Sequence, residues 1–92
     1  MIGDSHAAHW FSALKQKQTF TTTLSQVTSS GCRPTINTVG AKRCSDLIGW
    51  AFNDLVTNTK FDKIFLSGNW QNSDVDKLKE TIKYLENYSD NI

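Results

Sequence analysis

The sequence predicts an α/β fold in which a parallel sheet is covered by helices on both faces. Along the chain, three segments with strand character alternate with three segments of helical periodicity. This alternation is typical of parallel sheets, because each crossover helix returns the chain to the same end of the sheet. With 92 residues, the chain provides one domain at most, near the lower limit for a self-sufficient core.

The first strand and the first helix meet at Asp4 and Ser5. Residues 1–3 resemble the end of a strand, and either Asp4 or Ser5 can cap the helix that follows. Four apolar residues share one face of that helix: Ala7, Trp10, Phe11 and Leu14. Residues 20–28 are rich in Thr, Val and Phe and predict a strand. Residues 29–40 carry Gly, Pro and Asn and predict a loop.

The second half of the chain contains the clearest helix, a short strand and a last helix. Apolar side chains recur at helical spacing at Cys44, Leu47, Ile48, Ala51, Phe52 and Leu55. We expect Trp50, in the same helix, to pack in the core. Residues 61–66 predict a strand buried on both faces, because 64–66 are continuously apolar. Ser73 is expected to cap the last helix. The apolar side of that helix consists of Val75, Leu78, Ile82 and Leu85.

Composition and charge exclude several classes of protein. Ten basic and nine acidic residues leave a net charge of +1, without the basic face that a nucleic-acid-binding protein presents. No apolar stretch approaches the roughly 20 residues that span a bilayer, and the first residues lack the features of a signal peptide. The two Cys and two His residues lack the paired spacings of zinc sites. We therefore expect neither a metal nor a cofactor.

Cys32 and Cys44 lie twelve residues apart. Their spacing alone does not distinguish a disulfide from two reduced thiols in the core. Reduced thiols are expected in a cytosolic protein, and a disulfide is expected in an exported one.

Ser5, Gly31 and Asn69 each follow one of the three predicted strands. Ligands of open parallel sheets bind beyond the carboxyl ends of the strands, so these residues are expected to gather at one rim. A serine between a strand and a helix lies where free N–H groups and the positive helix end favour negative charge. Such a serine can attack a carbonyl while nearby donors stabilise the oxyanion. The alternative is that Asp4 or Ser5 only caps the helix.

The segment Gly3-Asp4-Ser5-His6-Ala7 resembles the first sequence block of the SGNH hydrolases. It is most similar to the SGNH domains associated with acyltransferase-3 type membrane O-acyltransferases. Further matches follow in the same order along the chain, at Cys32, Pro34, Cys44 and the run Phe65-Leu66-Ser67-Gly68-Asn69-Trp70. The resemblance spans essentially all 92 residues.

The resemblance implies a three-layer α/β/α, flavodoxin-like sandwich with a parallel sheet, truncated after about three strands. Residues 1–92 would form a partial SGNH-like domain that runs from the Gly-Asp-Ser block to the third helix. In the strand order of the family the second strand lies outermost, then the first, then the third. Residues 61–66 would then form an exposed sheet edge through which the chain could form a homodimer.

The resemblance also assigns roles at the rim. Ser5 would be the nucleophile, and its N–H, the N–H of Gly31 and the side-chain amide of Asn69 would form the oxyanion hole. Residues 67–69 depart from the GxND form of the family's third block. Gly31 and Asn69 are also residues that turns require. The DxxH segment that supplies the family's catalytic base does not occur here, so we expect the base to lie outside these 92 residues.

Two further residues are candidates for a substrate pocket. His9 follows Ser5 by one helical turn, and Trp70 follows the third predicted strand. A histidine in the position of His9 is more often a satisfied surface or boundary residue, and we interpret His6 as part of the family motif and not as the base. The aromatic face of Trp70 suits an acyl or sugar group.

The resemblance implies a serine-dependent O-acyl esterase or O-acyltransferase that acts on acyl esters, with cell-surface glycans as candidate substrates. It also implies a periplasmic or other extracytoplasmic location, a Cys32–Cys44 disulfide, and a link to a membrane acyltransferase domain in the parent protein. A hypothesis from another class is a noncatalytic binding or interaction module that retains only the fold.

Overall fold

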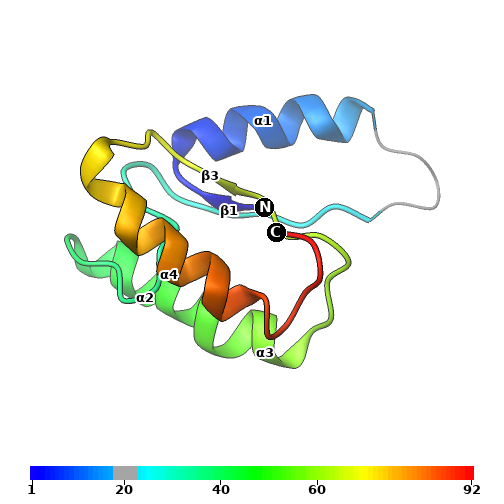
Figure 1. Cartoon of the computed structure of the whole chain (residues 1–92). Coiled ribbons are helices and arrows are strands. Elements are labelled where there is room, and N and C mark those ends of the chain that lie inside the picture. Colours follow the sequence, from blue (N-terminus) through cyan, green and yellow to red (C-terminus); the bar gives the residue numbers. More distant parts are fainter. Residues whose placement is uncertain (18–22) are drawn as a thin grey trace.

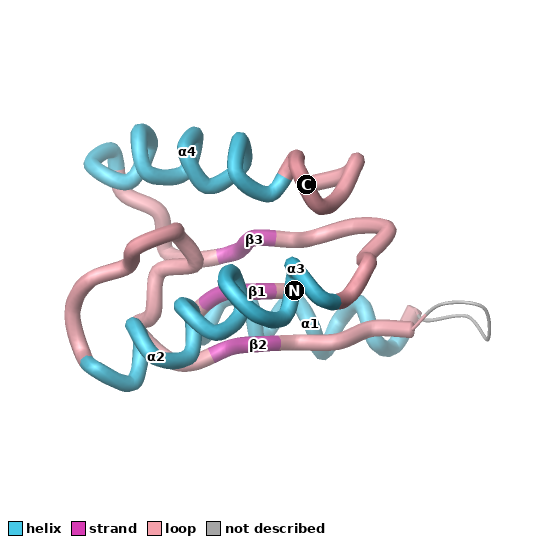
Figure 2. The backbone as a smooth tube through the Cα atoms, turned by 90° about the horizontal axis from the view of Figure 1, so that it is seen from below, coloured by secondary structure: helices cyan, strands magenta, loops and turns pink. Residues whose placement is uncertain are grey.

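The computed structural model describes residues 1–17 and 23–92 and has the predicted α/β architecture. Three short parallel strands form one sheet in the order β2-β1-β3 (Figure 2). Their bounds are Ile2–Gly3 for β1, Val27–Thr28 for β2 and Leu66–Ser67 for β3. This is the strand order that the family resemblance implies, with the first strand at the centre.

Helices cover both faces of the sheet, so the molecule has three layers (Figure 1). The helix α1, Ser5–Gln16, lies on one face, and the remaining helices lie on the other. Their bounds are Lys42–Trp50 for α2, Val56–Asn58 for α3 and Val75–Leu85 for α4. A π-helical turn, Ala51–Leu55, joins α2 to α3, so the clearest predicted helix is one continuous helical segment. None of the helices in the described ranges is long and apolar enough to cross a membrane.

The hydrophobic core lies between the sheet and the layer formed by α2, α3 and α4. Its buried residues are Ile2, Cys32, Cys44, Ile48, Ala51, Phe52, Val56, Ile64 and Leu85. The helical periodicity predicted for residues 44–55 is therefore confirmed. The opposite side of the sheet is covered more thinly, because Ala7 is the buried residue of α1.

Two tryptophans lie on the surface, contrary to expectation. Trp50 is 47% exposed. It follows the buried Ile48 by two residues, which at about 100° per residue turns its side chain away from the core. Trp10 is 62% exposed, because α1 approaches the strands mainly through the small side chain of Ala7. The prediction that Trp50 packs in the core was wrong.

Two of the strands are shorter than predicted. Of the predicted strand 20–28, only Val27–Thr28 pairs; 23–26 are irregular, and 18–22 lie outside the described residues. The third strand is confined to Leu66–Ser67, and it is not buried on both faces. Ile64 points into the core, whereas Phe65, which alternation directs to the thinly covered face, is 44% exposed.

The last helix begins later than predicted, and Ser73 is not its cap. A 3₁₀ turn, Asn72–Asp74, precedes α4. The backbone N–H of Gln71 donates to the carboxylate of Asp74 at 2.8 Å, which completes a capping box between these two residues. The cap prediction was wrong because the capping box forms between Gln71 and Asp74, so the helical turn begins two positions before Ser73 is reached.

The outer edge of β3 is partly covered by the end of the chain. The N–H of Ile64 donates to the carbonyl of Asn91 at 2.8 Å, and the carbonyl of Asp62 accepts from the side chains of Ser89 and Asn91. On the other edge of β3, the carbonyl of Phe65 accepts from the N–H of Ile2, and the carbonyl of Ser67 accepts from the N–H of Asp4. Since backbone groups alternate in direction along a strand, those of Leu66 point to the open side.

Replacing Gly3 by Ala should destabilise the protein severely. The new methyl group would overlap the carbonyl oxygen of Ser67 and lie 2.7 Å from Cβ of Ala7, so β1 and β3 would have to separate. We expect the free energy of unfolding to fall by about 3 kcal/mol, at the upper end of overpacking effects.

Gly49→Ala is the matched control, because nothing lies within 4 Å of the methyl group that it adds to α2. This control should stabilise the helix by up to about 1 kcal/mol. Urea unfolding followed by circular dichroism compares the variants. Similar stabilities for both would contradict the close approach of β1 and β3.

Candidate active site

Three loops meet at the carboxyl ends of the three strands, as expected. Ser5 begins α1 directly after the central strand, Gly31 lies in the loop after β2, and Asn69 lies in the loop after β3. Because β1 lies between the other two strands, the Ser5 turn lies between the other two loops (Figure 2). All three residues are exposed to solvent.

Asp4, and not Ser5, caps α1. Oδ1 of Asp4 accepts a hydrogen bond of 2.8 Å from the backbone N–H of His6. The hydroxyl of Ser5 forms no hydrogen bond with any residue that the structure describes, and neither does its backbone N–H. The alternative in which Ser5 serves only as the cap is therefore not the one adopted. Its hydroxyl stays available at the positive end of a 12-residue helix.

The Asp4 carboxylate also binds the loop after β3. Its Oδ2 accepts a hydrogen bond of 2.8 Å from the backbone N–H of Asn69, 65 residues away in sequence. Burial by itself would raise the pKa of Asp4, which is 3% exposed, but the N–H groups of Asn69 and His6 outweigh burial. The pKa of Asp4 is therefore held below its usual value of 3.8, and the carboxylate is ionised at neutral pH.

Asn69 keeps its side chain free. Its backbone N–H is used by Asp4, whereas its side-chain amide forms no hydrogen bond within the described part of the chain. Trp70, the next residue, is half-buried, and its backbone N–H donates to the carbonyl of Gly68 at 3.0 Å. Asn69 can therefore donate from its side chain at the rim while its backbone is held.

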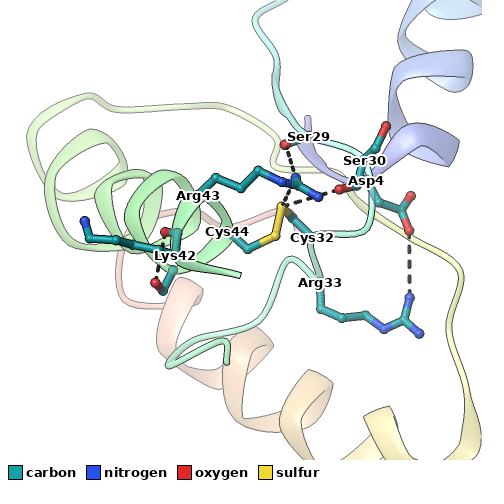
Figure 3. The surroundings of a disulfide bond; sticks show 9 residues. Asp4, Ser29, Ser30, Cys32, Arg33, Lys42, Arg43 and Cys44 are labelled. Carbon is teal, nitrogen blue, oxygen red and sulfur yellow. Dashed lines mark hydrogen bonds and ion pairs between the residues drawn. A yellow bond between two sulfur atoms is a disulfide. The ribbon is translucent and has the colours of Figure 1, made fainter. Parts of the chain in front are cut away.

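Gly31 has a positive φ of 75°, a conformation that favours glycine, so the turn after β2 accounts for a glycine at this position. That role leaves its N–H free, because no described residue accepts from it. The next residue, Cys32, forms a disulfide with Cys44 of α2, and both cysteines are buried (Figure 3). The disulfide thus attaches the Gly31 loop to the helix layer.

Two arginines at this rim were missed by the sequence analysis. Arg43 donates to Oγ of Ser29 at 2.7 Å and to Sγ of Cys32 at 3.3 Å, beside the Gly31 turn (Figure 3). Arg33 lies between two carboxylates, 3.8 Å from Oδ2 of Asp4 and 3.2 Å from Oδ2 of Asp74. No sequence spacing signals these contacts, because each joins residues on different elements: Arg43 of α2 contacts the loop after β2, and Arg33 contacts residues that follow β1 and β3.

The two histidines differ in their surroundings. Nδ1 of His6 lies 3.5 Å from Oδ1 of Asp4, so His6 faces the carboxylate that caps the helix. His9 is exposed on α1, and its imidazole forms no hydrogen bond or ion pair with the described residues. Its expected place in a pocket with Trp70 stays a prediction. Within residues 1–17 and 23–92, no group of three or more His, Cys, Asp or Glu side chains could hold a metal ion.

Comparison with known proteins gives one match. A family model described as an SGNH domain fused to AT3 domains matches residues 1–92, so all three rim loops lie inside the matched region. No curated protein and no solved structure matches the chain.

Reduction of the disulfide should lower stability and loosen the Gly31 loop. Closing a loop of 12 residues restricts the unfolded chain, so we expect reduction to cost about 2–3 kcal/mol in the free energy of unfolding. The intact mass should rise by two hydrogens, and amide exchange should accelerate around Gly31. Two free thiols in protein folded under oxidising conditions would contradict the pairing.

Proposed function

The chain belongs to the family of SGNH domains that are fused to AT3 domains, and on this basis we propose that it provides the nucleophile and the oxyanion-binding loops of a serine-dependent O-acyl esterase or O-acyltransferase. Membership of this family supports a domain of the hydrolase or acyltransferase type. The observation that carries the proposal is the hydroxyl of Ser5, which has no hydrogen-bond partner among the described residues. It lies at the start of a helix and between two loops whose Gly31 N–H and Asn69 side-chain amide likewise have no partner there. An uncommitted serine in this position suits attack on an ester carbonyl.

The proposed reaction proceeds in two steps. Oγ of Ser5 attacks the carbonyl carbon of the acyl donor while its proton passes to a base. The oxyanion that forms accepts hydrogen bonds from the N–H groups of Ser5 and Gly31 and from the side-chain amide of Asn69. The tetrahedral intermediate then expels the donor alcohol, which takes the proton from the base, and leaves an acyl-serine.

In the second step, water or a sugar hydroxyl attacks the acyl-serine, which gives hydrolysis or transfer respectively. We assign the base to a DxxH segment of the parent domain outside residues 1–92. The imidazole of His6 lies against Asp4, and the imidazole of His9 forms no hydrogen bond with the residues that the structure describes. His9 and Trp70 are proposed to line the pocket for the acyl group or the glycan. No step of this scheme requires a metal or a cofactor.

We place this chemistry outside the cytoplasm, on O-acyl groups of cell-surface glycans, in a parent protein with a membrane acyltransferase domain. The fusion to AT3 domains supports the membrane link. The Cys32–Cys44 disulfide is compatible with an oxidising compartment.

The open side of β3 is proposed to pair with a second copy of the chain. The backbone groups of Leu66 point to that side, beyond the part that Asn91 covers. Light scattering of the 92-residue chain across a concentration series should show a rising mean mass, because edge pairing is concentration-dependent. A monomer at every concentration would contradict the dimer.

Replacing Ser5 by Ala in the complete parent domain should lower kcat for a small acetyl ester by about 10⁴-fold or more, because it removes the nucleophile. The circular dichroism spectrum should not change, since Asp4 provides the cap.

His9→Ala, on the same exposed end of α1, is the comparison variant. It should lower kcat by less than about tenfold, because His9 is proposed to line the pocket and not to act as the base. If His9→Ala matched Ser5→Ala in a folded protein, the base would lie within this chain. If turnover survives in Ser5→Ala, it comes from another esterase in the preparation. That result would favour the noncatalytic module.

A further inference from the structure

We propose that Asp4 is a positioning residue for the oxyanion hole: its buried carboxylate, together with Arg33 and Asp74, holds the loop that presents the Asn69 amide beside Ser5. This inference rests on the proposed function, and it assigns a role to the residue next to the nucleophile. The contacts that carry it join all three rim loops.

Both oxygens of Asp4 accept backbone hydrogen bonds from different elements. Oδ1 accepts from the N–H of His6, which fixes the first turn of α1 behind Ser5. Oδ2 accepts from the N–H of Asn69, which fixes the loop after β3. One side chain therefore sets the distance between the turn that carries the nucleophile and the loop that carries the amide donor.

A second connection holds the same loop on its other side. The N–H of Gln71 donates to Oδ2 of Asp74, and Nε of Arg33 lies 3.2 Å from that oxygen. The Arg33 side chain also reaches within 3.8 Å of Asp4. The Asn69 loop is thus held at two backbone N–H groups, that of Asn69 itself and that of Gln71.

The charges of this cluster fit that task. The Arg33 guanidinium lies between the two carboxylates, and the His6 imidazole lies 3.5 Å from Asp4 on the other side. Asp4 is 3% exposed, so it cannot reach a substrate itself. It acts through the groups that it holds, and a buried carboxylate with fixed partners moves little during a reaction.

The variant Asp4→Asn tests the role, because asparagine has the same size but one acceptor oxygen and cannot accept both N–H groups. In the complete parent domain we expect kcat to fall by about 10-fold to 10²-fold with little change in KM, since the amide donor is displaced from the developing oxyanion. Asn69→Ala should lower kcat by about 10²-fold.

The double variant decides whether Asp4 acts through Asn69. If it does, Asp4→Asn should lower kcat no further once Asn69 is alanine. If the two losses multiply, the proposal is overturned. Should Asp4→Asn fail to fold, Arg33→Gln takes its place in the same cycle and tests the proposal through its second connection, because it removes the guanidinium that lies between Asp4 and Asp74.

A measurement that needs no turnover separates this inference from the proposed function. In the 92-residue chain, the amide resonances of His6 and Asn69 should shift together as Asp4 is protonated, with a midpoint below pH 3.8. If the backbone amide resonance of Asn69 does not shift with pH, the hydrogen bond from that N–H to Asp4 is overturned. Loss of Ser5-dependent turnover with an intact amide response would overturn the proposed function alone.

Asp46→Asn is the matched control. It removes one carboxylate from an exposed ion pair with Lys42 on α2, and Asp46 takes part in none of the contacts that hold the Asn69 loop. It should change neither kcat nor the amide shift of Asn69. A loss of kcat equal to that of Asp4→Asn would show that net charge, and not position, is responsible.

Discussion

The close approach of β1 and β3 at Gly3 is the constraint on which the candidate site depends. The central strand contributes two residues to the sheet, and one of them has no room for a side chain beside Ser67. This spacing brings Asp4, the next residue, within hydrogen-bond distance of Asn69. A wider separation of the two strands would leave the Asp4 carboxylate buried without one of its donors, which is costly in a protein interior.

Because the sheet is short, polar contacts at the rim are needed to hold the loops in place. Each strand pairs over two residues, so the ladder itself provides few hydrogen bonds to orient the loops that follow. The loops are fixed instead by side chains: Asp4 between β1 and β3, and the disulfide of Cys32 between the β2 loop and α2. Apolar packing on the α2–α4 side supplies the rest, with Ile48 and Leu85 fully buried.

The sequence predicted the order of elements, the main helices and the three positions at the rim, because periodicity and motif are local signals. It could not predict which of Asp4 and Ser5 caps α1, since both residue types are good caps and the choice depends on Asn69, 65 residues away. Trp50 was misplaced because core packing was expected for it as part of an amphipathic helix, although it lies outside the apolar stripe of that helix, two positions after Ile48. The contacts of Arg33 require the fold, because they join loops that follow different strands.

The division of labour within Gly3-Asp4-Ser5 has a consequence for how such a domain can diverge. The first two residues are needed by the fold, since one allows two strands to meet and the other joins their loops. The third is exposed and its hydroxyl forms no hydrogen bond with the residues that the structure describes, so the architecture does not depend on that hydroxyl. A descendant that gave up catalysis would be free to change the serine first and would still be obliged to keep the glycine and the aspartate. Retention of Gly-Asp in a homologue is therefore a marker of descent and folding, whereas under the proposed function the residue that follows is the marker of chemistry.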